Sequence, residues 1–276
     1  MVSGKKKFSD NPVVSIVIPT FNSEKILPLC LQSIKDQTYP NIEVIVIDNY
    51  SRDDTAQIAK KFGTRLLLLA SERSSARNLG AKEAQGSFIF FLDSDMELTP
   101  TVVEECISVC LHKSVDAVNV YEVSVGGGFI AECRKIEREM RIGSNVSEAP
   151  RFFRREVFDS VDGYDENLVS GEDFDLRRRI EDAGYRIGRC KAEIRHHEGE
   201  MSMRRLVLRF YYYGKSLPSF LKKNPSFAMK TSSPVHIMKN LGLMRKRPIP
   251  FVCLIAIKLV EYMAYLGGVF SIAFSR

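Results

Sequence analysis

The feature that most constrains the fold is a regular alternation of apolar runs and amphipathic segments over the first 120 residues. The expected strands are 13–18, 42–47, 65–70, 87–92 and 117–121, and the expected helices are 24–36, 53–62, 74–84 and 99–112. The strands read as continuous apolar runs, which is typical of strands buried on both faces. Strands that alternate with helices form a parallel sheet covered by those helices. We therefore predict an open, mostly parallel α/β sheet flanked by helices.

Polar residues follow three of these strands, at the sheet edge where open α/β folds bind ligands. Thr20 and Asn22 follow the first strand, Asp48 follows the second, and Asp93 and Asp95 follow the fourth. The two carboxylates after the fourth strand point the same way, and their repulsion is costly unless a cation compensates for it. Mg²⁺ and Mn²⁺ take oxygen ligands and are commonly shared with substrate phosphates. The pattern predicts a site for Mg or Mn here, with two exposed turn aspartates as the alternative.

Other patterns exclude two kinds of phosphate-binding loop. Gly126–Gly128 lies in no strand–GxGxxG–helix pattern, and no GxxxxGK[ST] occurs, so neither a dinucleotide site nor an ordinary P-loop is expected. The six cysteines form no CxxC pair, which favours a reduced, intracellular setting. The start lacks the apolar region of a signal peptide. We expect segment 1–12 to be disordered and the catalytic part not to be exported.

Six stretches in a fixed order together resemble the family 2 glycosyltransferases of the GT-A fold. They are IVIPTFN, EVIVIDNYSRDDT, SSARNLGAKEAQG, FIFFLDSDMELTP, GYDENLVSGEDFDLRRRIEDAGY and IRHHEGEMS. The resemblance covers roughly residues 12–202 and implies a GT-A sheet of Rossmann-like type. In it, 13–120 would form the nucleotide-sugar-binding half and 121–202 the acceptor half. We expect the stretch from about 130 to 200 to be less regular than the first half.

The resemblance implies a UDP- or GDP-linked sugar as donor and assigns six residues to its binding. They are Pro19, Thr20, Asn22, Asp48, Arg77 and Asp93. The first three would line the nucleotide pocket, and Asp48 would accept a hydrogen bond from the base. Arg77 would approach the nucleotide with Asn78 beside it, and Asp93 would hold the ribose or a metal-bound water. Asp95 would ligate the Mg or Mn ion that joins both phosphates.

The same resemblance suggests catalytic acids and a second metal ligand. Glu172 and Asp173 open an expected helix, where the helix dipole stabilises carboxylates, so helix capping is the simple alternative. The resemblance makes Asp173 the general base that deprotonates the acceptor hydroxyl, with Glu172 orienting acceptor or base. It also places a metal-binding His after the next strand. Its glycine spacing favours His196, with His197 or a surface histidine pair as the alternatives.

The resemblance therefore implies an inverting, metal-dependent hexosyltransferase that moves one sugar to a hydroxyl acceptor. Processive members of the family carry a QxxRW signature, and this chain contains no Trp, so a non-processive enzyme is expected. A polyprenyl-phosphate sugar synthase is the alternative, but its anionic acceptor needs no base, and the intact Glu172–Asp173 pair favours a hydroxyl. An inactive carbohydrate-binding scaffold is the alternative from a different class, and the retained acids argue against it.

Residues 203–276 combine positive charge with an apolar tail. Between residues 201 and 250 there are eleven Lys and Arg and no Asp or Glu, which predicts an anionic partner. The run 249–274 is long enough to cross a bilayer, and its charges Lys258 and Glu261 are spaced to pair on a helix. This apolar run favours a membrane surface over nucleic acid as the partner.

We accordingly expect 203–276 to be a basic, helical, membrane-associating extension at the cytoplasmic face of the cell membrane. There it would hold the active site beside a lipid-linked glycan acceptor. The tail could cross the membrane, lie on it, or join copies of the chain into an oligomer, and a packing helix of a soluble protein is the remaining alternative. Because every motif precedes residue 203, removal of the chain after about Asn240 is expected to leave a donor-hydrolysing domain.

Overall fold

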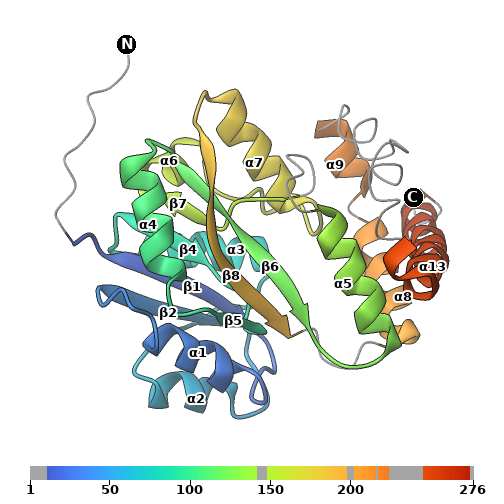
Figure 1. Ribbon diagram of the computed structural model, residues 1–276, viewed down its shortest axis with the longest axis horizontal. Coiled ribbons are helices and arrows are strands. Elements are labelled where there is room, and N and C mark those ends of the chain that lie inside the picture. Colours follow the sequence, from blue (N-terminus) through green and yellow to red (C-terminus); the bar gives the residue numbers. More distant parts are fainter. Residues whose placement is uncertain (1–10, 142–147, 198–201, 216, 224–244, 274–276) are drawn as a thin grey trace.

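The structure, a computed structural model, describes residues 11–141, 148–197, 202–215, 217–223 and 245–273. Segment 1–10 of the expected disordered start lies outside the described residues, as do the basic residues Lys230 and Lys239. The centre of the molecule is an eight-stranded mixed sheet in the order β3-β2-β1-β4-β7-β6-β8-β5. Helices flank this sheet, as Figure 1 shows. The expected α/β architecture is confirmed.

The strands are β1 (Val14–Thr20), β2 (Ile42–Asp48), β3 (Arg65–Leu68), β4 (Phe88–Phe91), β5 (Met96–Leu98), β6 (Ala117–Val125), β7 (Phe152–Arg154) and β8 (Ile187–His197). The helices of the first half are α1 (Leu27–Lys35), α2 (Thr55–Lys61), α3 (Arg73–Glu83) and α4 (Val102–His112). Those that follow are α5 (Phe129–Arg141), α6 (Arg155–Ser160), α7 (Glu172–Asp182), α8 (Met203–Gly214), α9 (Leu217–Lys223) and α13 (Pro248–Ala273). Every element expected before residue 121 is present within a few residues of its expected bounds.

The first half of the sheet is parallel and the second half is mixed. β1 pairs in parallel with β2 and β4, and β2 pairs in parallel with β3. β7 then runs antiparallel to both β4 and β6, whereas β6 and β8 are parallel. The last strand, β5, pairs antiparallel with β8. The parallel pairing places Thr20 opposite Asp48, so the ends of β1 and β2 meet at one edge of the sheet.

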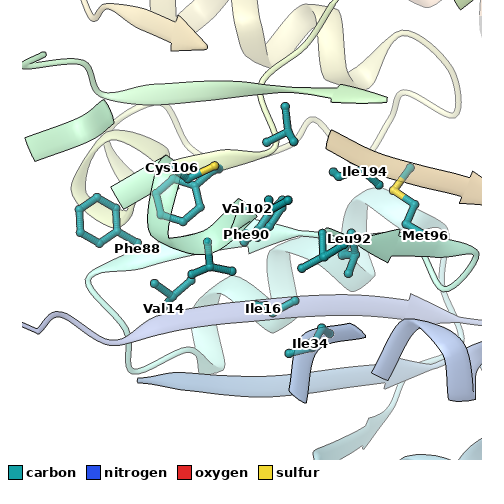
Figure 2. Packing of buried hydrophobic residues seen from close by; sticks show 14 of the residues in the cluster. Val14, Ile16, Ile34, Phe88, Phe90, Leu92, Met96, Val102, Cys106 and Ile194 are labelled. Carbon is teal, nitrogen blue, oxygen red and sulfur yellow. The ribbon is translucent and has the colours of Figure 1, made fainter. Parts of the chain in front are cut away.

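Two apolar clusters cover the two faces of the sheet. On one face, Ile16 of β1 and Phe90 of β4 pack with Ile34 of α1 and Cys106 of α4, as Figure 2 shows. On the other face, Val17 of β1 packs with side chains of α3, α6 and α7. Each fully buried Ile or Phe side chain stabilises the fold by roughly 1.5–3 kcal/mol. These clusters hold β1 and β4, and therefore the polar residues at their ends, in fixed positions.

A third apolar cluster lies at one end of the molecule, where α5, α8 and α13 come together (Figure 1). It contains Cys133 and Ile136 of α5, Leu206 of α8, and Leu254 of α13. The extension expected after residue 203 is therefore helical where it is described, and it packs on the rest of the chain. The described residues between 129 and 197 form α5, β7, α6, α7 and β8. This stretch is more regular than the sequence led us to expect.

Candidate active site

The predicted metal-binding acids lie directly after β4, at the carboxyl edge of the sheet. The Asp95 Oδ2 atom is 3.3 Å from His196 Nε2. The two residues meet because β5 pairs antiparallel with β8, with Met96 opposite His196. His197 instead places its Nε2 atom 2.7 Å from the Glu97 carboxylate. Of the two histidines, His196 is therefore the one that the fold brings to Asp95.

Asp95 and His196 fit a divalent cation. Neighbouring ligands of an octahedral ion with bonds of about 2.1 Å lie about 3 Å apart, which matches the 3.3 Å between their atoms. On the other side of the imidazole ring, His196 Nδ1 has Glu122 at 3.3 Å and Arg138 at 2.7 Å, so Nε2 is the nitrogen that faces Asp95. Within the described ranges, no group of three or more His, Cys, Asp and Glu side chains could hold a metal. Further ligands would come from phosphate and water.

Glu122 is a site residue that the sequence analysis missed. Its carboxylate lies 2.5 Å from Arg151 Nε and 2.6 Å from Arg138 Nη1, behind the His196 ring. Burial raises the pKa of Glu122, but Arg151, His196 and Arg138 outweigh it and hold this pKa well below its usual range. A carboxylate behind a metal-binding histidine fixes the orientation of the ring. Glu122 lies inside β6, away from every recognised motif, and nothing local in the sequence marks it.

The acidic neighbours of the His196 ring favour its protonated form. Burial lowers the pKa of His196, but hydrogen bonds with Asp95 and Glu122 raise it to about 9. A cation at Nε2 would take the place of that proton, because a metal ligand must be the neutral imidazole.

The Arg77 side chain is buried behind the carboxylates of Asp93, Glu172 and Asp173. Its side chain is only 1% exposed, and its Nη2 atom is 2.8 Å from Asp93. Its Nη1 atom is 3.2 Å from Asp173 and 3.5 Å from Glu172. Burial raises the pKa of Asp93, but Arg77 and Arg151 hold this pKa far below its usual range. Arg77 thus joins acids from distant parts of the chain, and its contact with the nucleotide stays a prediction.

The neighbouring Asn78 points elsewhere. Its side-chain amide donates to the Tyr164 carbonyl over 2.8 Å and its oxygen accepts from the Tyr164 amide over 2.9 Å. Asn78 therefore fixes the loop before α7, and its approach to the nucleotide stays a prediction.

The two predicted catalytic acids differ in exposure at the start of α7. The helix begins after Gly171, whose φ of 83° lies in the left-handed region that favours glycine. The Glu172 side chain is 5% exposed, with Arg73 and Arg77 each 3.5 Å away, whereas the Asp173 side chain is 32% exposed. Burial and the adjacent Asp173 charge raise the pKa of Glu172 to about 7. Asp173 is therefore the acid that a second substrate can reach.

Two pockets lie on either side of the Asp93–Arg77–Asp173 contacts. The larger pocket, of about 390 Å³, is lined by the predicted residues Pro19, Thr20, Asp93, Asp95 and His196, among others. The smaller pocket, of about 220 Å³, is lined by Asp173 together with Glu122, Arg138 and Arg151. The arrangement can hold one substrate beside Asp95 and His196 and a second beside Asp173.

Two other predicted donor-binding residues brace the wall of the larger pocket. Asp48 is buried, and its Oδ1 atom accepts from Thr20 Oγ1 over 2.9 Å while Oδ2 accepts from the Ser51 amide over 2.9 Å. The Asn22 amide donates to Ser51 Oγ over 2.8 Å, and its side-chain oxygen accepts from the Arg52 amide over 2.9 Å. Both hold the loop after β2 against β1. Their contacts with a nucleotide stay predictions.

Three further residues of the larger pocket escaped the sequence analysis. Arg73 precedes Arg77 by one turn of α3, and Arg209 and Tyr213 lie one turn apart on α8. The i, i+4 spacing places each pair on one face of its helix, which is the signal that could have found them. The sequence analysis assigned the basic and aromatic residues after 203 to a lipid surface. In the structure, Arg209 and Tyr213 of that segment line the larger pocket.

We expect Arg209→Ala to lower kcat/KM for the donor at least tenfold, because a charge-assisted hydrogen bond to the diphosphate is worth roughly 1.5–3 kcal/mol. The measurement is donor hydrolysis over a range of donor concentrations. The matched control is Arg204→Ala, an exposed arginine of the same helix that does not line the pocket. Equal effects of the two substitutions would show that only the net charge of α8 matters.

Comparison with known proteins gives one family and consistent relatives. Residues 15–161 match the sequence model of glycosyl transferase family 2. Glycosyltransferase AglE of Haloferax volcanii is 32% identical over 193 residues, which are 64% of this chain and 64% of that protein. Chondroitin synthase of Escherichia coli is 27% identical over 195 residues, 63% of this chain but 27% of that protein. The matched region thus spans less than two thirds of either relative.

Solved structures share the fold at low sequence identity. A mannosyltransferase from Pyrobaculum calidifontis, in complex with GDP-Man and Mn²⁺, superposes with a TM-score of 0.67 at 15% identity over 95% of this chain and 88% of that one. Residues 1–349 of S. aureus TarS, in complex with UDP-GlcNAc, give 0.58 at 19% identity over 96% and 92%. These similarities extend over the C-terminal helices as well as the sheet.

Proposed function

Because the chain belongs to glycosyl transferase family 2, we propose that it is a metal-dependent, inverting glycosyltransferase that moves one hexose from a nucleotide-diphosphate sugar to a hydroxyl acceptor. One observation carries the proposal. The buried Arg77 links Asp93, which lines the larger pocket, to Asp173, which lines the smaller pocket. A donor and an acceptor would therefore meet at this contact. The UDP-GlcNAc and GDP-Man complexes of proteins with the same fold support such a donor.

The residues of the chain can carry out a single displacement. An acceptor hydroxyl in the smaller pocket gives its proton to the Asp173 carboxylate while its oxygen attacks the anomeric carbon of the sugar. The bond from that carbon to the diphosphate oxygen breaks on the opposite face, so the configuration inverts. Arg73 and Arg209, on the wall of the larger pocket, would neutralise charge on the departing diphosphate. When bound by Asp95 and His196, a divalent cation would supply Lewis-acid stabilisation of the same leaving group.

We propose a lipid-linked glycan as the acceptor, since a long apolar helix lies beside the catalytic domain. One observation favours a second candidate, a polyprenyl-phosphate sugar synthase. Arg138 and Arg151 line the smaller pocket, where cations would suit an anionic acceptor. Both already contact the Glu122 carboxylate, so their charge is partly compensated. The hydroxyl acceptor is therefore the preferred assignment.

The donor class is tested by incubating the full chain with a panel of UDP- and GDP-linked sugars and Mn²⁺ or Mg²⁺. We expect slow hydrolysis of donors that carry one nucleotide base, because water can take the place of the acceptor beside Asp173. EDTA should stop the reaction. If no donor is hydrolysed and none binds in calorimetry, the catalytic proposal is wrong and a carbohydrate-binding scaffold takes its place.

A further inference from the structure

α13 presents a continuous apolar face away from the protein. In the described part of the chain, one segment, Pro248–Ser271 within α13, has the length and composition of a membrane span. Tyr262 is 60% exposed, and six apolar residues of the helix are each between 44% and 68% exposed: Ile249, Val252, Ile255, Leu259, Met263 and Phe270. At about 100° per residue, these six fall within an arc of about 120°. We call these six residues the outer face of α13.

The opposite face of α13 is fixed to the catalytic domain. Phe251, Leu254 and Ile257 are buried in the cluster that α13 shares with α5 and α8. The Lys258 Nζ atom lies 2.6 Å from Glu137 of α5 and 2.6 Å from Glu261 of α13 itself. The pairing predicted for Lys258 and Glu261 is thus present, and it is directed inward. Because the charged side chains Lys258 and Glu261 pair on the inner side of the helix, the six residues of the outer face include no charge.

These contacts extend along most of α13. Near its end, Gly268 crosses α8 so closely that a Cβ atom there would lie 2.0 Å from the Tyr211 carbonyl oxygen. A Cβ atom on Gly214 would lie 2.1 Å from the Tyr265 carbonyl oxygen. The two glycines allow the backbones of α8 and α13 to touch. The helix is held to α5 and α8 from Phe251 to Gly268.

This attachment argues against a helix that crosses the membrane. To span a bilayer, α13 would have to leave α5 and α8, or carry them into the hydrocarbon. α5 bears Lys135, Glu137, Arg138 and Glu139, and charged side chains within a bilayer are rare because they are costly. Arg138 also contacts Glu122 and His196 in the active site. Moving α5 would therefore dismantle the site.

Exposed basic residues border the outer face at one end. Phe210 of α8 contacts Lys258 and Tyr265, and Gly214 contacts Gly268, so α8 and α13 run in the same direction. The exposed basic residues Arg204, Arg205, Arg245 and Lys246 therefore all lie toward the N-terminal end of this helix pair. Anionic lipid headgroups complement this charge. A second copy of the chain would bring the same positive charge to the contact.

We propose that α13 lies flat on an anionic membrane surface, with its outer face among the lipid headgroups and upper acyl chains and the basic residues at its start on the lipid phosphates. In this position lipid replaces water around the outer face, and α13 loses none of its contacts with α5 or α8. Because α8 also carries Arg209 and Tyr213 of the larger pocket, the active site would be held at the membrane surface. This inference does not depend on which sugar is transferred.

The test measures flotation of the full chain with phosphatidylcholine vesicles, with and without phosphatidylglycerol. We expect binding to the anionic vesicles, weakened by salt, and release by alkaline carbonate. Val252→Glu combined with Leu259→Glu should lower the partition coefficient at least tenfold, because two embedded apolar side chains are lost. The matched control is Leu68→Glu, the same leucine-to-glutamate change at a 52% exposed residue of β3, which should bind as the wild type does. Unchanged thermal melting verifies that each variant is folded.

Any one of the following three results would overturn the proposal. Retention in the membrane after alkaline carbonate would mean that α13 crosses the bilayer. Equal binding of the double variant and the wild type would place the membrane contact elsewhere. A wild-type dimer that the double variant converts to monomers, without vesicle binding by either, would assign the outer face to a second copy of the chain. None of these outcomes depends on donor hydrolysis, so failure here is distinguishable from failure of the proposed catalytic function.

Discussion

Asp173→Asn is expected to lower the turnover of sugar transfer by about three to four orders of magnitude while the donor Kd stays within about twofold of the wild type. Asparagine keeps the size of the side chain and can still accept from Arg77, which lies 3.2 Å away, but it cannot take the acceptor proton. The measurement combines single-turnover transfer with calorimetric titration of the donor.

The matched control is Asp182→Asn at the exposed end of the same helix, which should leave both quantities unchanged. Loss of donor affinity together with turnover would make Asp173 structural and direct the search for a base to Glu172. Unimpaired transfer to a polyprenyl phosphate by the Asp173→Asn variant would favour the second candidate function, because that acceptor needs no base.

The second large effect concerns the metal. Asp95→Ala and His196→Ala should each lower donor hydrolysis by about two to three orders of magnitude, because each removes a ligand of an ion worth several kcal/mol of leaving-group stabilisation. EDTA should abolish the activity of the wild type, and Mn²⁺ or Mg²⁺ should restore it. Calorimetric titration of Mn²⁺ in the presence of the nucleoside diphosphate provides a readout that does not require turnover.

His197→Ala is the control, because the His197 side chain contacts Glu97 and not the Asp95 carboxylate. It should retain near-normal Mn²⁺ affinity and activity. If His197→Ala loses as much affinity as His196→Ala, the sheet register alone does not select the ligand. Full activity of Asp95→Ala in chelator would remove the metal from the mechanism.

Part of the active site could be predicted from the sequence because it depends on local pattern. An apolar run that ends in Asp93 and Asp95 is a strand whose polar end must leave the core, and the run that ends in Asp48 does the same. Parallel strands bring such ends to one edge of the sheet. The same reasoning gave Glu172 and Asp173 their place at a helix start, where two carboxylates are stabilised.

α5 shows where the local pattern was present but not recognised. Ile130, Cys133, Ile136 and Met140 recur at helical spacing and lie on its inner face in the third cluster. The charged residues between them concealed this periodicity. Without α5, the sequence predicted that removal of the residues after about Asn240 leaves a donor-hydrolysing domain. In the structure, that truncation would expose the apolar residues of α5 and α8.

The sequence by itself determined the strands and helices of the first half and the type of chemistry at their ends. The reason is that the spacing of apolar residues shows which side of each strand or helix is buried. Tertiary structure alone decided which distant side chains meet. The antiparallel register of β5 and β8 selects His196 over His197, Arg77 joins Asp93 to Asp173, and α8 brings Arg209 to the pocket. The physical reason is that periodicity reports which side of an element is buried, whereas the partner that buries it is set by packing between segments far apart in the chain.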